Sequence, residues 1–342
     1  MSFNKVAVLG LGKVGHLAAE LLAEAGFAVT GVDAREISGC PFPTKAADLT
    51  DKDALAAILK GQEAVLSCLP YHLNIGVSTV AHGLGLHYFD LTEDVPTTKH
   101  IRDLAKTAKG IMAPQCGLAP GFVGIVGALP QNPTGLLGYA FNWSPEGVVN
   151  EYLNDCEVIE EGVLKSVSAM EWLETIYIDG MKLEAFTTSG GLGTMCETYA
   201  DRIENLDYKT MRYPGHVELM NFFFHELLMR ENRTEAGRIL TNAKPPVDED
   251  VVYVHVAAEG YADGQLKRRE FVRSYYPLEI GGKRRTAIAW TTSASVVAVI
   301  EMARDGKLPA KGFLKQEEIP LMSYLETRTG NYYNIGHKGR HG

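Results

Sequence analysis

Three glycines stand close together near the start of the chain, where a short apolar run, residues 5–10, gives way to a helical pattern. Gly10 permits a tight turn, Gly12 lets backbone N–H groups approach a pyrophosphate, and Gly15 allows a helix to pack closely on the preceding strand. The N-terminus of that helix would stabilise the phosphate charge. The pattern predicts a dinucleotide-binding turn made of Gly10, Gly12, Lys13, Val14 and Gly15.

An acidic residue supports the same interpretation, because a second apolar run ends at Asp33, 18 residues after Gly15. A carboxylate at this position accepts hydrogen bonds from the adenosine ribose hydroxyls and repels a 2′-phosphate, which favours NAD over NADP. Arg35, two residues later, can turn toward a 2′-phosphate, so NADP stays open as the less favoured cofactor. We expect Ala34, between these two residues, to contact the cofactor as well.

Two further loops are expected at the carboxyl ends of parallel strands, where open α/β sheets bind their ligands. Asp48 and Leu49 precede an expected helix near 51–60, and they either touch the adenine or form only a local turn or helix cap. The second loop follows an apolar run at 64–69, and its Cys68 is interpreted as an inert buried thiol rather than a nucleophile. From this loop we predict contacts with the cofactor through Cys68, Leu69 and Pro70, and with the substrate through Tyr71.

The elements that must position these residues alternate regularly over the first third of the chain. Short apolar runs are separated by amphipathic segments with helical spacing, which is typical of βαβ units. We therefore predict an α/β protein whose Rossmann domain, residues 1–122, contains a doubly wound parallel sheet. The expected strands are 5–10, 27–32, 64–69, 87–91 and 110–114, and the expected helices after the glycine turn lie near 51–60, 73–84 and 97–108.

Past residue 120 the pattern changes to strand-like runs with fewer helices, which predicts a second, α+β domain for substrate binding and dimerisation over residues 123–290. A helical pattern at 291–305 opens a C-terminal segment, 291–325, that is a candidate to pack back on the first domain. The tail, 327–342, is predicted to be weakly ordered. The strand-like runs are 137–143, 163–170, 172–178, 182–188, 251–259 and 268–276, with a helical pattern at 215–231.

Composition and charge narrow the possible function classes. The 342 residues are 46% hydrophobic and 22% charged, as in ordinary folded proteins, and the formal net charge of −9 argues against a nucleic-acid partner. The five cysteines are widely spaced and no H-E-x-x-H motif occurs, so neither a disulfide framework nor a metal site is predicted. No signal-peptide pattern opens the chain, and its uncharged stretches are broken by Pro and Gly. We expect a cytoplasmic protein without a membrane partner.

Several short elements, together with the glycine pattern, resemble the saccharopine dehydrogenase superfamily, and within it the lysine 6-dehydrogenases in particular. The resemblance extends from about residue 5 to about residue 325, so it covers nearly the whole chain. It implies an NAD(P)-dependent oxidation of a carbon that bears an amine, on a Rossmann domain joined to an α+β domain. It also implies a homodimer. The elements are Leu69–Tyr71, Tyr88–Leu91, Cys116–Gly121, Thr188–Gly191 and Arg212–His216, of which Cys116–Gly121 and Arg212–His216 are the most specific.

The element that begins at Cys116 continues as a turn without charged side chains. Gly117, Leu118 and Ala119 lie between an expected strand and an apolar segment. A rigid, uncharged turn is suited to pressing on a flat nicotinamide and to leaving backbone N–H groups available. We predict that these residues bind the cofactor; the alternative is that they only connect the two domains.

The two later elements offer groups that bind carboxylates. Ser189 and Gly190 combine small side chains with accessible backbone donors, which can hold a carboxylate in a nest or form only a glycine turn. Arg212 and His216 flank a Pro-Gly turn, and either can meet a substrate carboxylate, Arg212 with bidentate geometry. Structural hydrogen bonds are the alternative for both. We predict that all four residues contact the substrate.

Oxidation of an amine by NAD requires a neutral nitrogen, so a group of the protein must accept the ammonium proton. His72 has the intrinsic pKa nearest neutrality and is the predicted base. Asp90 or Glu93 would pair with the substrate ammonium and hold it in position, with Thr92 of the same loop as a substrate contact. Each of the three titratable residues is equally consistent with a solvated loop position.

The resemblance therefore implies an oxidative deamination. L-Lysine would lose a hydride from C6, and water would hydrolyse the resulting imine to 2-aminoadipate 6-semialdehyde, which cyclises to a piperideine carboxylate while ammonia is released. A saccharopine dehydrogenase or reductase and a carboxynorspermidine-type reductase are alternatives within the same chemistry. A non-catalytic, NAD-binding regulatory protein that keeps the fold is the alternative of another class.

Overall fold

The computed structural model describes residues 3–119 and 126–337, which form two compact units. Unit 1 comprises residues up to 119 together with 289–335, and unit 2 comprises residues 126–288 with 336 and 337. Pro120 and Gly121 of the predicted cofactor element, the expected domain boundary at 122, and the last five residues of the expected tail lie outside this range. Within the described residues, no helix is both long and apolar enough to cross a membrane.

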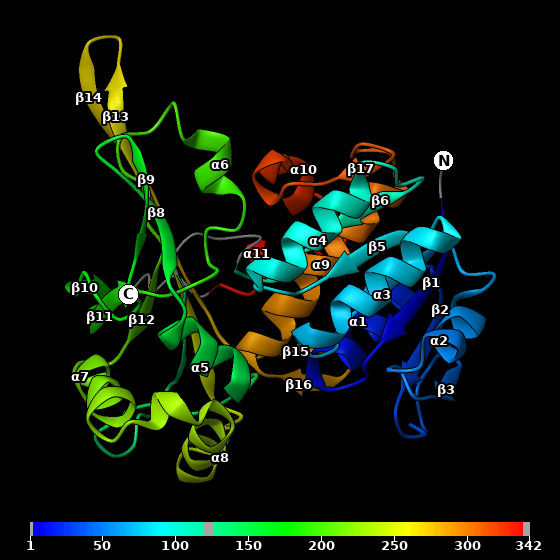
Figure 1. Cartoon of the computed structure of the whole chain (residues 1–342), viewed down its shortest axis with the longest axis horizontal. Helices are drawn as coiled ribbons and strands as arrows, with labels where there is room; N and C mark the ends of the chain where they lie inside the picture. Colours follow the sequence, from blue (N-terminus) through cyan, green and yellow to red (C-terminus); the bar gives the residue numbers. More distant parts are fainter. Residues whose placement is uncertain (1–2, 120–125, 338–342) are drawn as a thin grey trace. The chain divides into compact units, whose positions relative to one another are not determined.

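Unit 1 is built on a parallel sheet, and the structure confirms the predicted α/β fold with its doubly wound topology (Figure 1). Successive strands are added outward on one side of β1 as far as β3, and on its other side from β4 to β6. The order therefore reverses between β1 and β4, which is where such sheets bind ligands. The sheet runs β3 (Thr44–Ala46), β2 (Ala28–Asp33), β1 (Lys5–Leu9), β4 (Ala64–Ser67), β5 (His87–Asp90), β6 (Ile111–Ala113) and β17 (Gly312–Phe313).

Helices cover both faces of this sheet. Right-handed crossovers place α2, α3 and α4 on one face, where Leu55, Val77 and Ile101 share one apolar cluster with the strands. On the other face α1 lies beside α9, whose Ser293 hydroxyl donates to the Val14 carbonyl over 2.9 Å. The helices of this unit are α1 (Lys13–Glu24), α2 (Lys52–Leu59), α3 (Tyr71–Leu84), α4 (Val95–Ala105), α9 (Ala287–Arg304), α10 (Leu321–Leu325) and α11 (Tyr332–Ile335), with a short 3₁₀ turn at Gln316–Glu318.

The segment after residue 326 is more ordered than its polar composition predicts. Glu301 of α9 accepts hydrogen bonds from the backbone N–H and the hydroxyl of Thr329, at 3.0 and 3.1 Å. Tyr333 of α11 is buried and donates to the Thr291 carbonyl. The expectation of a weakly ordered tail is therefore wrong for residues 327–335, because a buried carboxylate and a buried tyrosine anchor them to α9.

Unit 2 contains a mixed six-stranded sheet and a separate apolar core, as expected for an α+β domain. β12 pairs with β7 in parallel, and the other neighbours are antiparallel. The sheet order is β10 (Glu174–Ile178), β11 (Met181–Thr187), β12 (Lys209–Arg212), β7 (Val126–Pro130), β13 (Asp250–Ala262) and β14 (Gln265–Tyr275). Two hairpins stand apart from it, β8 (Cys156–Glu160) with β9 (Val163–Val167), and β15 (Leu278–Ile280) with β16 (Lys283–Arg285).

Three helices of unit 2, α5, α7 and α8, pack on this sheet through one cluster that includes Val148, Phe186, Met211 and Leu240. The helical pattern at 215–231 is interrupted, because α7 passes into a π-helical turn at Phe222–Glu226 and a 3₁₀ turn at Met229–Glu231. The remaining helices are α5 (Pro145–Leu153), α6 (Met195–Tyr199), α7 (His216–Asn221) and α8 (Arg233–Ala243).

One predicted strand of this unit is wrong. Residues 137–143 form no strand, although the run is apolar and Tyr139, Ala140 and Phe141 are all buried. Gly135 and Gly138 have φ angles of +66° and +56°, which an extended strand does not tolerate. Burial of consecutive residues therefore arises here from an irregular segment that crosses the core.

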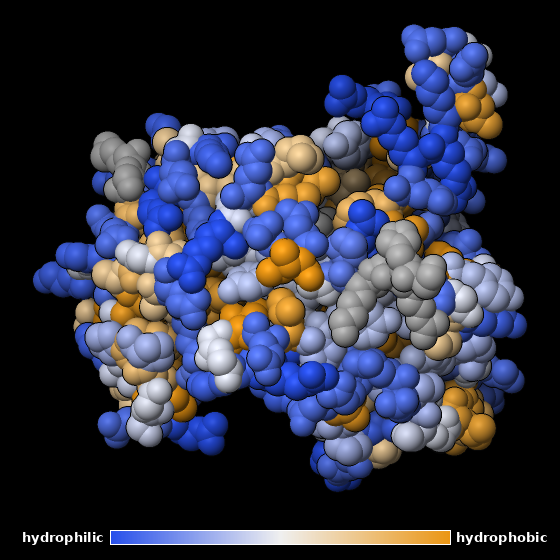
Figure 2. All heavy atoms as spheres, turned by 180° about the vertical axis from the view of Figure 1, so that it is seen from behind, coloured by the Kyte–Doolittle hydropathy of each residue, from blue (hydrophilic) through white to orange (hydrophobic). Residues whose placement is uncertain are grey.

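The hairpin of β13 and β14 extends beyond the other strands of its sheet (Figure 1). Its far end is exposed and carries mainly hydrophilic side chains (Figure 2). Arg268 lies 2.5 Å from Glu270 on β14 and 3.7 Å from Glu259 on β13. Charged side chains of this kind protect an exposed edge strand against pairing with other chains.

Candidate functional site

The structure brings the predicted cofactor loops to one edge of the unit 1 sheet. In the strand register, Leu9 pairs with Val32 on one side and Ser67 on the other, and Ser67 pairs with Asp90. The strands are parallel, so the loops that follow them leave at the same edge. These loops contain Gly10–Gly12, Asp33–Arg35, Cys68–Pro70, Leu91–Glu93 and Gln115–Ala119.

The glycine turn has the geometry that a dinucleotide requires. Gly10 has a φ of +83°, and a methyl group on Gly15 would stand 1.9 Å from the Gly10 carbonyl oxygen. At Gly12, by contrast, no atom of the described chain lies within 4 Å of the position of a Cβ. Among the described residues no side chain caps the N-terminus of α1, which leaves the backbone N–H groups near Lys13 and Val14 to an anion.

Asp33 ties this turn to the end of β2. One carboxylate oxygen accepts from the Leu11 N–H over 2.8 Å, and the other accepts from the Arg35 N–H over 3.2 Å. A carboxylate has about four lone-pair positions, so Asp33 can still accept from ribose hydroxyls. Ala34 and Arg35 are exposed beside it. The arrangement fits a dinucleotide whose ribose lies against Asp33.

The structure gives the side chains of Asp48 and Leu49 local roles. Asp48 accepts hydrogen bonds from the hydroxyl and the backbone N–H of Thr50, at 2.6 and 2.9 Å, and these lower the pKa of its exposed carboxyl. The Leu49 side chain is buried in the apolar cluster under α2. Of the two interpretations of this pair, the structure favours a local turn over adenine contacts by the side chains.

Cys68, Leu69 and Pro70 connect β4 to α3, and the Cys68 N–H donates to the Leu9 carbonyl over 2.8 Å. Burial, with a smaller contribution from the charge of Asp90, raises the pKa of the Cys68 thiol to about 12. Such a thiol stays protonated at neutral pH. Tyr71 and His72 form the first turn of α3, with Tyr71 half-buried, His72 exposed, and their rings perpendicular at 5.8 Å.

Asp90 ends β5 and is fully buried. It accepts hydrogen bonds from the Tyr88 hydroxyl at 2.7 Å, the Thr92 N–H at 2.9 Å and the Gln115 N–H at 3.0 Å. Burial nevertheless dominates and raises the pKa of the Asp90 carboxyl to about 6. The structure thus uses this carboxylate to hold the loops after β5 and β6 together, in place of the substrate contact that we expected.

Thr92 and Glu93 lead from β5 into α4. Thr92 is buried, and its hydroxyl oxygen accepts the Asp94 N–H over 3.2 Å. Asp94 in turn caps α4 by accepting from the N–H of Thr97 over 2.9 Å. Glu93 is half-buried between them. Of the two predicted carboxylates, Glu93 therefore retains partial exposure at the carboxyl edge, and Asp90 does not.

The predicted nicotinamide turn is anchored on α9. The Ser295 hydroxyl donates to the Gly117 carbonyl over 2.7 Å, and the Leu118 side chain is buried. Ala119 is half-buried and is the last residue that the structure describes in this loop. Gln316 donates to the Pro114 carbonyl over 2.8 Å, so the loop is held at both ends. Such anchoring suits a turn that must present a fixed surface to a flat ring.

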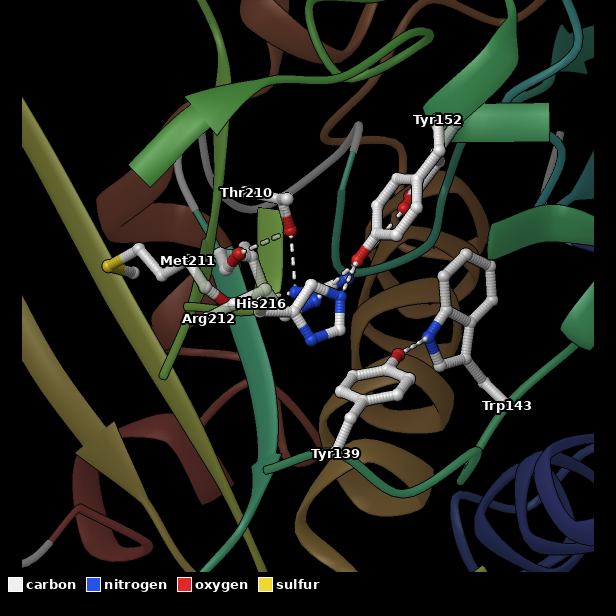
Figure 3. A network of polar contacts seen from close by, with 9 residues as sticks. Tyr139, Trp143, Tyr152, Thr210, Met211, Arg212 and His216 are labelled. Carbon is white, nitrogen blue, oxygen red and sulfur yellow. Dashed lines mark hydrogen bonds and ion pairs between the residues drawn. The ribbon is translucent and has the colours of Figure 1, made fainter. Parts of the chain in front are cut away.

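In unit 2 the predicted substrate residues Arg212 and His216 belong to one buried polar network (Figure 3). Arg212 Nε donates to the Tyr152 hydroxyl oxygen over 2.7 Å. Its Nη1 donates to the Thr210 hydroxyl at 2.7 Å and to the Met211 carbonyl at 2.9 Å. Three of the five guanidinium N–H donors are thus used internally. We expected Arg212 to bind a substrate carboxylate through two nitrogens, but Nε and Nη1 already have partners, so such a contact would use Nη2.

The same network sets the protonation of His216. The Tyr152 oxygen accepts from Arg212, so its O–H donates to His216 Nε2 at 3.0 Å, and Nδ1–H donates to the Leu137 carbonyl at 3.1 Å. Burial, and next the charge of Arg212, lowers the pKa of His216 to about 3. His216 is therefore neutral and internally satisfied, and it does not provide the carboxylate contact that we expected.

A carboxylate stands beside the remaining guanidinium nitrogen. Glu151 Oε2 of α5 lies 4.0 Å from Arg212 Nη2, with both side chains buried. This distance permits charge attraction but exceeds that of a hydrogen bond. The backbone carbonyl of Glu151 accepts the Ser189 N–H over 3.0 Å. Opposite charges thus lie close together in the part of unit 2 that contains two predicted substrate elements.

Ser189 and Gly190 form a turn in which both donors of Ser189 are already used. The Ser189 hydroxyl donates to the Asp155 carbonyl over 2.9 Å, in addition to the backbone bond to Glu151. Gly190 has a φ of +87° and accepts from the Gly193 N–H. For Ser189 the glycine turn is therefore the better interpretation, and a carboxylate contact through Gly190 stays a prediction.

The sequence interpretation missed Glu151, Tyr152 and Thr210. Thr210 and Arg212 are two residues apart on one strand and so share a face, a signal that the sequence does contain. Glu151 and Tyr152 lie on α5, a helix that begins with Ser144 as its N-cap followed by Pro145. This Ser-Pro start is a recognisable helix signal.

Comparisons with known proteins agree with this architecture. The family model of the saccharopine dehydrogenase NADP binding domain matches residues 6–113, and that of the saccharopine dehydrogenase C-terminal domain matches residues 93–330. The chain is similar in fold to apo saccharopine dehydrogenase (L-Glu forming) from Saccharomyces cerevisiae, with a TM-score of 0.73, 17% identity and 98% of each chain covered. A short-chain dehydrogenase/reductase superfamily protein from Agrobacterium tumefaciens matches 25% of this chain and 31% of its own, at 24% identity and a TM-score of 0.22.

Proposed function

Because the chain belongs to the saccharopine dehydrogenase family, a family of NAD(P)-binding oxidoreductases, we propose that it oxidises the CH–NH group of an amino acid. The proposed substrate is L-lysine, oxidised at C6 to 2-aminoadipate 6-semialdehyde with release of ammonia, and the proposed cofactor is NAD. A cytoplasmic location and a homodimer are parts of the same proposal.

The residues of unit 1 fit the cofactor. The uncapped N-terminus of α1 and the open side of Gly12 would hold the pyrophosphate, and Asp33 the adenosine ribose. The negative charge of Asp33 disfavours a 2′-phosphate, which supports NAD. The dinucleotide, when bound, supplies the hydride acceptor. The anchored Gly117–Ala119 turn would support its nicotinamide ring.

One observation favours a substrate with an α-amino acid head group. Arg212 Nη2 and Glu151 Oε2, 4.0 Å apart and buried, present one positive and one negative group side by side. The α-carboxylate of lysine would bind Arg212, and its α-ammonium would bind Glu151. The lysine half of saccharopine carries the same α-ammonium and α-carboxylate, so the pair supports an amino acid head group, and the activity assay below decides between lysine and saccharopine.

We assign proton transfer to exposed groups at the carboxyl edge of the unit 1 sheet. The substrate ammonium must lose a proton before hydride transfer, since a protonated nitrogen has no lone pair to assist it. His72 is exposed, so it can pass a proton to solvent. Glu93 retains partial exposure and stays the proposed partner of a substrate ammonium, a role that the buried Asp90 does not fill.

The test is absorbance at 340 nm with NAD or NADP and a panel of amines. Lysine, 6-aminohexanoate and 1,5-diaminopentane differ only in the α-ammonium and the α-carboxylate, and saccharopine tests the alternative. We expect lysine-dependent NADH formation with release of ammonia, and weak activity with the two analogues. Saccharopine-dependent reduction without lysine activity would overturn the proposed substrate.

A variant pair separates head-group recognition from general damage. Glu151→Gln removes the negative charge, so we expect KM for lysine to rise about tenfold or more, where tenfold is about 1.4 kcal/mol. The KM for 6-aminohexanoate, which has no α-ammonium, should stay unchanged. Glu218→Gln on the exposed face of α7 is the matched control. An equal loss for both substrates in the Glu151 variant would contradict the proposed contact.

A further inference from the structure

A nucleophile, an imidazole and a carboxylate meet in unit 1 outside the groups described so far. Cys40 Sγ lies 3.5 Å from His16 Nε2, and His16 Nδ1 lies 3.5 Å from Glu20 Oε1. Cys40 and His16 are both half-buried, so reagents in solvent can reach them. In this arrangement His16 can act as a base toward the Cys40 thiol, and Glu20 can orient the imidazole ring of His16.

The fold holds these three residues together from two segments. His16 and Glu20 are one helical turn apart on α1, and Cys40 lies in the connection between β2 and β3 (Figure 1). The Phe42 ring packs against the imidazole with ring centres 6.0 Å apart. The connection is itself braced, because the Thr44 hydroxyl donates to the Ile37 carbonyl over 2.8 Å.

The other four cysteines have a different environment. Burial raises the pKa of Cys68 and Cys156 to about 12 and that of Cys196 to about 11, and it raises the pKa of Cys116 as well. Thiols with such pKa values are unreactive at neutral pH. These cysteines therefore provide internal controls for any reaction of Cys40.

We propose that Cys40 is a modification site, a thiol activated by His16 and Glu20 that exchanges with low-molecular-weight disulfides. Nδ1–H of His16 faces Glu20, so Nε2 accepts the thiol proton. The Cys40 thiolate attacks one sulfur of the disulfide, a new S–S bond forms as the old one breaks, and the departing thiolate takes up the proton held by His16.

The position of Cys40 gives this reaction a consequence. The same connection follows Asp33, the last residue of β2, and begins with Ala34 and Arg35. These three residues are proposed to contact the adenosine, so this part of the inference rests on the proposed function. A bulky group on Cys40 would occupy space beside that loop. We expect the mixed disulfide to weaken NAD binding, and bound NAD to lower the equilibrium constant for forming the mixed disulfide by the same factor.

The experiment uses the reduced full chain and iodoacetamide at pH values from 6 to 9, with alkylation of each cysteine measured by peptide mass spectrometry. We expect Cys40 to react with an apparent pKa below the ordinary value of about 8.5. His16→Gln should restore the ordinary value and slow the reaction at pH 7 about tenfold, the factor for one pKa unit. His100→Gln, a half-buried histidine of α4, is the matched control.

A second measurement treats the protein with glutathione disulfide and compares its NAD dissociation constant with that of Cys40→Ser treated in the same way. A rise of about tenfold confined to the protein with Cys40 would support the coupling, and equal constants would overturn it. An ordinary pH profile for Cys40, unchanged in His16→Gln, would overturn the thiol assignment. Failure of the proposed function would appear separately, as absence of NAD binding before treatment, and the pH profile would still decide the assignment.

Discussion

Replacing Asp90 by Asn tests how unit 1 uses its buried carboxylate. Asp90 is fully buried, and its three hydrogen bonds join the loops after β5 and β6. Asparagine keeps one oxygen, which can accept from the N–H groups of Thr92 and Gln115, while its amide group can donate to Tyr88. The substitution therefore removes the charge and retains most of the hydrogen bonds.

The sign of the effect follows from the pKa of this carboxyl. Burial raises the pKa of Asp90 to about 6 in the folded protein, against about 3.9 for an unperturbed Asp. Between these values the native state binds more protons than the unfolded state, so the free energy of unfolding falls as pH rises from 4 to 6. Above pH 6 the ionised carboxyl lowers the free energy of unfolding by about 3 kcal/mol relative to a protonated Asp90. Asp90→Asn carries no such cost.

The assay is urea unfolding of both proteins at several pH values between 4 and 8. We expect Asp90→Asn to be more stable than the parent protein at pH 7.5, by an amount of the order of 3 kcal/mol, with the difference shrinking toward pH 4. Asp103→Asn, an exposed carboxylate paired with Lys106, is the control and should change stability by less than about 1 kcal/mol. An Asn variant that is less stable at pH 7.5, or a difference that does not vary with pH, would refute the reasoning.

Four further predictions concern the two units separately. Gly15→Ala places a methyl group 1.9 Å from the Gly10 carbonyl oxygen, so it should lower the melting temperature and abolish NAD binding in calorimetry; Gly12→Ala, with no described atom within 4 Å, should weaken NAD binding alone. Asp33→Ala should weaken NAD and improve the relative use of NADP, measured as the ratio of kcat/KM, and unchanged cofactor kinetics would remove the ribose assignment. Tyr152→Phe leaves the buried Arg212 Nε–H and His216 Nε2 without their partner, which should cost about 1–3 kcal/mol in denaturant unfolding. His72→Gln should shift the acidic limb of the pH–rate profile, and a parental profile would exclude His72 as the base.

Much of unit 1 can be predicted from the sequence because the relevant physics is local. Three glycines within six residues of chain have separate roles: Gly10 permits a tight turn, Gly12 lets a phosphate approach, and Gly15 allows the helix to pack closely on the strand. Apolar runs that alternate with amphipathic helices specify a parallel sheet, and right-handed crossovers then leave few possible strand orders. The ligand edge of that sheet, with Asp33 and Cys68 on it, follows from the topology.

The roles of the polar residues were decided by tertiary structure. Arg212, His216, Ser189 and Asp90 carry the chemical groups that the sequence indicates. Packing gives most of their donors and acceptors either to partners 25 to 79 residues away or to groups one or two residues away. Burial then sets their charge, as the opposite pKa shifts of His216 and Asp90 show. No local pattern encodes these long-range partners.

The pairing of Cys40 with His16 and the anchoring of residues 327–335 on α9 have the same origin. Each depends on two segments that approach one another only when the sheet of unit 1 has formed. Turn conformations and hydrophobic periodicity are properties of neighbouring residues, so the sequence alone determined the fold class and the dinucleotide turn. Hydrogen-bond partners and burial are properties of the packed chain, so only the tertiary structure decided which polar groups remain available for chemistry.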